Sequence, residues 1–180
     1  MIGWLLVLGC GVGEGGRNNN TRDLEAWYAL TEGQAWTYRD DGEDADPDEA
    51  ELLHARHVGD GEVELRRGAR WTDGEVEGRL TWDDSDGLAL VDWELGALTG
   101  SGDYPVLERD SSGGDEVGQG GWTCRIETLQ EIETFYGVFR EGVVAECTGV
   151  ALTGTYAFGK DVGLVAFEGG GLRLDLVAPW

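Results

Sequence analysis

The sequence has few of the side chains on which metal sites and acid–base catalysis usually depend. Only two of its 180 residues are histidine, His54 and His57, and the three cysteines form no CxxC pair. His54 and His57 lie three residues apart in a predicted strand, so their side chains should point to opposite faces and not share one ion. No G-x-S-x-G motif marks a nucleophilic serine. We therefore expect no metal, no cofactor and no catalytic residues.

Basic residues are also scarce. Thirteen Lys and Arg stand against 36 Asp and Glu, and the formal net charge is −23. Nucleic-acid binding needs a cationic surface, so this balance argues against DNA and RNA as partners. The same charge repels an anionic lipid surface, and any attachment to a membrane therefore has to be covalent or hydrophobic. The composition predicts a soluble, acidic surface.

The densest acidic run, 40–51, has part of the pattern of a calcium loop. Three aspartates have the spacing of the first EF-hand ligands: Asp44, Asp46 and Asp48. The sixth position of that loop should be Gly but is Glu49, and the twelfth should be Glu but is Ala55. The run is therefore interpreted as a solvated hairpin loop and not as a metal site.

Long helical periods are missing, and the chain instead consists of short alternating runs. Thirty-one glycines and only three prolines fit many tight turns between strands. Predicted strands, about ten in all, cover residues 34–39, 51–58, 62–71, 75–82, 88–93, 104–107, 122–134, 142–150, 153–158, 162–167 and 172–177, with a loop at 111–121. This pattern predicts an all-β fold with a single curved antiparallel sheet, or half-barrel.

Hydrophobic runs are short as well. The apolar run Met1–Gly9 is far below the roughly 20 residues that span a bilayer. It ends on Cys10, and Val7-Leu8-Gly9-Cys10 resembles the bacterial lipobox, although no Lys or Arg precedes it. In such lipoproteins the cysteine becomes the acylated first residue, and two or three acyl chains anchor stably. The alternative is a buried N-terminal strand with an ordinary cysteine.

The lipobox interpretation divides the chain into three parts. Residues 1–9 would be the signal, 10–23 the lipidated cysteine and a flexible Gly- and Asn-rich tether, and 24–180 the β-sheet domain. Gly11 after the cysteine is compatible with sorting to the outer membrane. We expect a bacterial envelope protein that is held to the membrane through Cys10, on either the periplasmic or the surface face.

Several short motifs follow one another in a distinctive order between residues 33 and 177. They are Gly33-x-x-Trp36-x-Tyr38, Asp86-Gly87-Leu88-x-Leu90, Pro105-Val106-Leu107, Gly121-Trp122, Gly137-x-Phe139, Tyr156-x-x-Gly159 and Val162-Gly163-Leu164-Val165. In this order the chain resembles a family of uncharacterised bacterial secreted lipoproteins with a curved antiparallel sheet. It departs from that family by inserting Lys160-Asp161 at a usually tight turn. The resemblance implies a fold and an envelope location, but no reaction.

The two remaining cysteines, Cys124 and Cys147, have two interpretations. In an oxidising periplasm they can bridge two strands, which would stabilise the fold by about 3 kcal/mol. The alternative is two unpaired buried cysteines, since pairing requires the Cα atoms to lie close together.

Tryptophan is abundant, with eight residues in the chain, and five of them recur along the predicted hairpins: Trp36, Trp71, Trp82, Trp93 and Trp122. They can be core packing, or Trp36, Trp82 and Trp122 can line a concave face that holds an acyl chain or a polymer. We expect a non-enzymatic binding or structural role, with a protein partner or a hydrophobic ligand. The alternative is a carboxylate-dependent hydrolase, for which Glu131 and Glu133 are the best candidate pair.

Overall fold

The protein folds as one continuous antiparallel β-sheet. The computed structural model describes residues 32–40, 51–72, 74–149 and 152–179, and within these ranges the regular structure is entirely β. The strands are β1 (Ala35–Asp40), β2 (Glu51–Gly59), β3 (Glu62–Arg67), β4 (Val76–Asp83), β5 (Gly87–Leu95), β6 (Leu98–Glu108), β7 (Glu116–Gln119), β8 (Trp122–Glu133), β9 (Val138–Thr148), β10 (Gly154–Gly159), β11 (Gly163–Gly169) and β12 (Leu172–Pro179). The prediction of an all-β curved sheet is confirmed.

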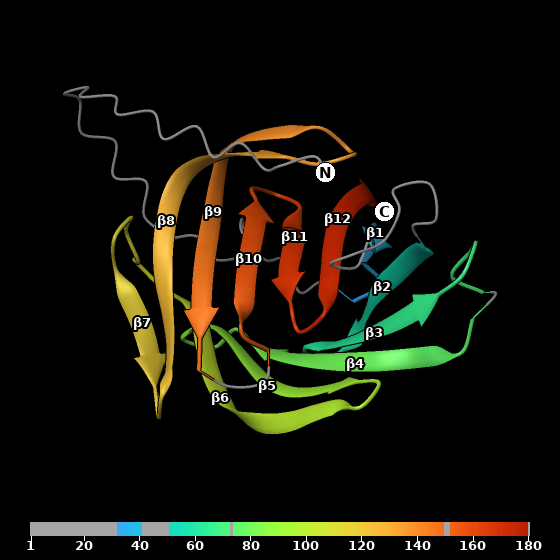
Figure 1. Ribbon diagram of the computed structural model, residues 1–180, viewed down its shortest axis with the longest axis horizontal. Coiled ribbons are helices and arrows are strands. Elements are labelled where there is room, and N and C mark those ends of the chain that lie inside the picture. Colours follow the sequence, from blue (N-terminus) through green and yellow to red (C-terminus); the bar gives the residue numbers. More distant parts are fainter. Residues whose placement is uncertain (1–31, 41–50, 73, 150–151, 180) are drawn as a thin grey trace.

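The order of the strands brings the two ends of the sheet domain together. It runs β6-β5-β4-β3-β2-β1-β12-β11-β10-β9-β8-β7, so the first and last strands pair at its centre. The two edge strands are β6 and β7, which follow one another in the chain and lie against each other (Figure 1). The half-barrel that the sequence predicts is therefore a nearly closed barrel.

The described residues form twelve strands, where the sequence predicted about ten. The additional strand β7 lies in the glycine-rich stretch predicted to be a loop, and β6 begins at Leu98 instead of Tyr104. Both segments are rich in Gly, Ser and Asp, which local propensity assigns to turns, and only pairing with a neighbouring strand makes them extended. The signal, Cys10, the tether and the acidic run 41–50 lie outside the described residues.

A short seam between β6 and β7 is bridged by side chains instead of a backbone ladder. Gln119 Nε2 donates hydrogen bonds to the carbonyl oxygen and Oδ2 of Asp103, at 2.8 and 2.7 Å. Trp122 Nε1 donates to the Pro105 carbonyl at 2.9 Å. The Tyr104 ring lies between Trp93 and Trp122, with centroids 5.2 and 5.6 Å away. These contacts join β6 to β7 and β8 and limit the exposure of the sheet edges.

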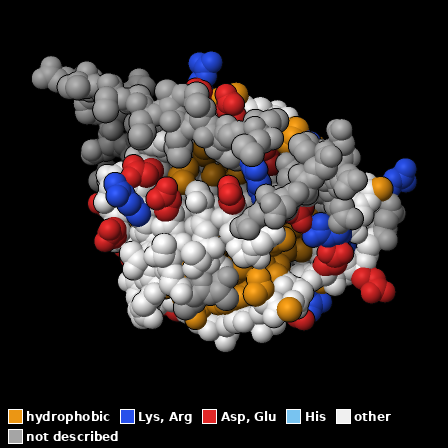
Figure 2. Space-filling view, viewed as in Figure 1, with side chains coloured by type: hydrophobic (Ala, Val, Ile, Leu, Met, Phe, Trp, Pro, Cys, Tyr) orange, Lys and Arg blue, Asp and Glu red, His pale blue; other side chains and the backbone are white. Residues whose placement is uncertain are grey.

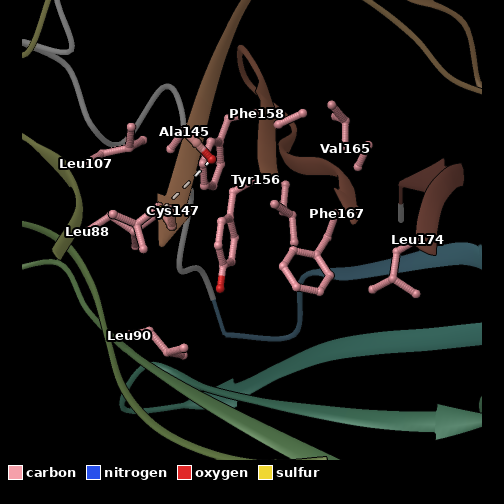
Figure 3. Packing of buried hydrophobic residues seen from close by; sticks show 14 of the residues in the cluster. Leu88, Leu90, Leu107, Ala145, Cys147, Tyr156, Phe158, Val165, Phe167 and Leu174 are labelled. Atoms are coloured by element: carbon pink, nitrogen blue, oxygen red, sulfur yellow. Dashed lines mark hydrogen bonds between the residues drawn. The ribbon is translucent and has the colours of Figure 1, made fainter. Parts of the chain in front are cut away.

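The inside of the barrel is filled by the alternate residues of its strands. Tyr38 lies opposite Leu53 on one neighbouring strand and Leu176 on the other. Figure 3 shows Tyr156 and Phe167 projecting side by side from β10 and β11, toward the wall that carries Leu88 and Leu90. The edge of Tyr156 meets Trp82 of β4, with ring centroids 6.3 Å apart. Because β4 and β10 are far apart in the sheet, this contact crosses the barrel and closes the core.

The three tryptophans that the sequence assigns either to core packing or to a ligand face belong to this filled core. Trp36, Trp82 and Trp122 are only 2%, 3% and 1% exposed. Trp36 Nε1 also donates to the Val162 carbonyl at 2.7 Å, which fixes its ring inside the barrel. Of the two interpretations, these exposed fractions support core packing, and the three rings form no open ligand face. Closure of the sheet turns its concave side into a packed interior.

A long β8–β9 hairpin covers the outside of β10 to β12. Its end folds across the outer face of these strands (Figure 1), where small residues such as Ala157 and Ala166 are buried. A Cβ atom placed on Gly159 would lie 2.5 Å from the Phe139 ring, so only glycine leaves room for the hairpin there. The amide of Tyr136 donates to the Leu176 carbonyl at 2.8 Å. The hairpin thus forms a partial second layer.

Candidate functional site: an apolar mouth at one end of the barrel

A hollow of about 350 Å³ opens at one end of the barrel, which we call the mouth. It lies where the β5–β6 turn at Gly96 and the β11–β12 turn at Gly170 approach β3 and β4. In Figure 2 hydrophobic side chains are visible in a hollow at the lower part of this face. The leucines that line the mouth come from β2, β3, β5, β6 and β12: Leu53, Leu65, Leu95, Leu98 and Leu172.

Strand alternation explains why leucines gather at the mouth. Leu53 and Leu65 point inward from β2 and β3 and are almost fully buried, whereas Leu95 at the end of β5 is only half-buried. Gly78 lies opposite Leu95, and a Cβ atom there would lie 2.8 Å from Leu95 Cδ2. The missing side chain at Gly78 therefore lets the leucines approach the backbone of β4. The two turns end the barrel wall before it covers Leu95, Leu98 and Leu172, which are only half-buried.

The rim of the mouth carries a charge cluster centred on Arg67. Its Nη2 donates to Asp40 Oδ2 at 2.8 Å, and its Nε donates to Glu77 Oε2 at 2.9 Å. Leu65 pairs with Gly78 and Arg66 with Val76, so Glu77 occupies a bulge beside Arg67. Burial by itself lowers the pKa of Arg67, but hydrogen bonds and charges from Asp40 and Glu77 outweigh it and leave this pKa raised. Arg67 stays charged and bound to both carboxylates.

A second hollow, of about 390 Å³, lies along the seam and is polar. Its acidic residues are Asp83, Asp86, Asp103 and Glu108. The Ser85 amide donates to Asp83 Oδ1 at 2.9 Å and lowers the pKa of that carboxyl, as expected for a turn-stabilising contact. Within the described ranges no group of three or more His, Cys, Asp or Glu could hold a metal ion.

The other candidates from the sequence are dispersed over the molecule. Cys124 and Cys147 lie opposite each other on β8 and β9 and form a disulfide, with Cα atoms 4.0 Å apart. Glu131 and Glu133 are exposed on β8, a strand that contributes no residue to the mouth. His54 faces Thr37 on the outside of the barrel, and His57 faces Val63 inside it. None of these residues lines either hollow.

The mouth itself was not predicted from the sequence. Inward-facing leucines were visible in the strand alternation, but their exposure depends on where the turns at Gly96 and Gly170 end the wall. The place where these turns end the wall depends on how strands distant in the sequence pair with one another, and no local sequence pattern indicates it.

Comparison with known proteins adds no assignment, because no family model, curated protein or solved structure matches this chain. None of the segments that the structure describes forms a helix capable of crossing a bilayer. The fold and the site define the described part of the chain as a nearly closed antiparallel barrel of twelve strands, with a filled interior and an apolar mouth at one end.

Proposed function

We propose that the protein is a non-enzymatic binding protein that holds the hydrocarbon part of a ligand in the mouth of its barrel. One observation carries this proposal: five leucines from five strands converge on an open hollow, while the rest of the interior is packed. Ligand sites in proteins are concave, mostly apolar and usually preformed, with volumes of roughly 300–1,000 Å³. The mouth, at about 350 Å³, is near the lower end of that range.

The size of the mouth sets the expected affinity. Each methylene that leaves water contributes about 0.8 kcal/mol, so a chain of eight contributes roughly 6 kcal/mol before the cost of association. Binding constants in the micromolar to millimolar range follow. Such an affinity suits reversible capture of an amphiphile more than permanent storage of a cofactor.

The protein acts in the bacterial envelope and is attached to the outer membrane through acyl chains on Cys10. The lipobox-like Val7–Cys10 segment supports this anchor. The disulfide between Cys124 and Cys147 is consistent with an oxidising compartment, since cytosolic proteins rarely keep such bonds. Expression in a bacterial envelope followed by mass spectrometry tests the location. A chain that begins at Cys10 and carries acyl mass is expected, and an unmodified full-length chain would contradict the anchor.

A neutral fluorescent probe tests binding at the mouth. N-phenyl-1-naphthylamine should gain fluorescence with the protein, and Leu172→Asp should weaken its binding by about tenfold, because a carboxylate enters the apolar hollow. Leu172 is only half-buried at the rim, so the variant should still fold.

Val58→Asp is the matched control for the probe experiment. Val58 is a 40% exposed residue of β2 outside the mouth, and this variant should bind the probe as the unchanged protein does. Equal binding by all three proteins, or no binding by any of them, would overturn the proposal.

A further inference from the structure

The charges at the mouth determine which head group an amphiphile can carry. Among the described residues that line the mouth, Arg67 is the only cation. It already bonds to Asp40, whose side chain is 8% exposed, and to Glu77, whose side chain is 46% exposed. The carboxylates of Asp40 and Glu77 outnumber the single guanidinium of Arg67, so this cluster has a net negative charge. The formal net charge of the whole chain is also negative, at −23.

Binding of an anionic head group at the rim is expected to be unfavourable. To bind a fatty-acid carboxylate, Arg67 would have to release Asp40 or Glu77. Release of Asp40 would break the ion pair of a nearly buried carboxylate with Arg67, which is costly in a protein interior. Repulsion from the acidic surface adds to this cost and is reduced by salt.

Binding of a cationic head group at the rim is expected to be favourable. Glu77 stands at the edge of the mouth, beside the leucines, with nearly half of its side chain open to solvent. An ammonium group that leaves the hollow next to Glu77 can approach its carboxylate without displacing Arg67. We propose that the ligand of the mouth is an amphiphile with a hydrocarbon chain and a cationic amine or quaternary ammonium head. This inference rests on the proposed function.

Three ten-carbon amphiphiles with different heads test the preference. Decyltrimethylammonium, decyl maltoside and decanoate, each below its micelle concentration, compete with N-phenyl-1-naphthylamine for the full chain. In salt of about 0.15 M, where long-range effects are screened, the ammonium should compete about tenfold better than decanoate, with the maltoside between them.

A pair of isosteric variants separates the rim from the general acidity of the molecule. Glu77→Gln should weaken decyltrimethylammonium by about fivefold and should strengthen decanoate, because Arg67 loses one of its carboxylate partners. Glu131→Gln removes the same charge from β8, a strand that contributes no residue to the lining of the mouth, and should change the binding of neither amphiphile. Thermal melting checks that both variants fold. If they weaken the ammonium equally, the preference reflects net charge alone and the inference is wrong.

The outcomes also separate this inference from the proposed function. If the maltoside displaces the probe but decanoate competes as well as the ammonium, the apolar mouth binds ligands and the head-group preference is refuted. If no amphiphile displaces the probe from the unchanged protein, both the proposed function and the inference are refuted.

Discussion

Arg39 and Asp175 lie opposite each other in the β1–β12 ladder, and both hold the tip of the β8–β9 hairpin. The Arg39 guanidinium carbon stands 4.5 Å from the centre of the Phe135 ring, and Asp175 Oδ1 accepts a hydrogen bond from the Phe135 amide at 3.0 Å. The pairing that joins the first and last strands therefore also fixes a hairpin from the middle of the chain. The pairing of β1 with β12 and the docking of the hairpin share the same two residues.

Loss of the Asp175 carboxylate should release the hairpin tip. Asp175→Ala removes the acceptor of the Phe135 amide and should reduce the free energy of unfolding by about 1 kcal/mol. Hydrogen exchange at the Phe135 and Tyr136 amides should become faster, because both amides bond to β12. Asp175→Asn keeps an acceptor oxygen and should retain most of the protection. Equal protection in the Ala variant would show that packing alone holds the tip.

Removal of the disulfide should destabilise the barrel without changing its fold. Cys124 and Cys147 are separated by 23 residues in sequence, and their bond restricts the unfolded chain. The double variant Cys124→Ala/Cys147→Ala should lose about 3 kcal/mol in denaturant unfolding. A reductant should lower the midpoint of the unchanged protein but not that of the double variant. A midpoint equal in both proteins without reductant would contradict this expectation.

Much of the fold could be predicted from the sequence because strand periodicity and turn residues are local. The strands around Trp36, Tyr156 and Leu174 follow from alternation, and the turns at Gly61 and Gly171 have the positive φ angles that favour glycine. Closure of the barrel could not be predicted in this way. It depends on the meeting of the edge strands β6 and β7, on either side of a sheet whose centre is the pairing of Trp36 with Pro179. Alternation identifies inward-facing residues but not neighbouring strands.

The candidate site was missed for the same reason. The sequence leaves two interpretations of Trp36, Trp82 and Trp122, core packing and a concave ligand face, and the second is reasonable for an open sheet. In a nearly closed barrel the largest inward-facing rings fill the centre, and the open position moves to leucines at the end of the wall. Stronger curvature of the sheet therefore buries the aromatic residues on its concave side and leaves the leucines at the end of the barrel accessible.

The two histidines should respond oppositely to replacement by leucine. His57 is 3% exposed, and neither of its ring nitrogens has a hydrogen-bond partner within the described part of the protein. His57→Leu removes two unsatisfied polar atoms and should raise the free energy of unfolding by about 1–2 kcal/mol.

His54 is the matched control for His57. Its Nδ1 bonds with Thr37 Oγ1 at 2.9 Å, and its Nε2 bonds with the Gly68 carbonyl at 3.0 Å. His54→Leu should therefore destabilise the protein by about 1–2 kcal/mol. Denaturant unfolding of both variants measures the difference, and destabilisation of equal size in both would show that His57 has a partner such as a buried water.

Alkaline pH should destabilise the protein through two buried tyrosines. Burial raises the pKa of Tyr38 and of Tyr156 well above the usual value near 10. Each hydroxyl also donates to a backbone carbonyl at 2.7 Å, Tyr38 to Leu164 and Tyr156 to Leu152. Below pH 10 both states keep these protons and the full stability is present. Above it the unfolded chain releases protons that the folded protein retains, so stability falls as pH rises.

The test is how steeply the free energy of unfolding falls as the pH rises. Two such tyrosines should lower the free energy of unfolding by about 2 kcal/mol between pH 10 and 11, half of it from each residue, because the unfolded phenols are only partly ionised at pH 10. Tyr38→Phe should cost about 1 kcal/mol at pH 8, because the Leu164 carbonyl loses its donor, but should halve the slope between pH 10 and 11. Urea unfolding at pH 8, 10 and 11 compares the two proteins. An unchanged slope would mean that Tyr38 ionises in the folded barrel, and that the centre of the core admits water.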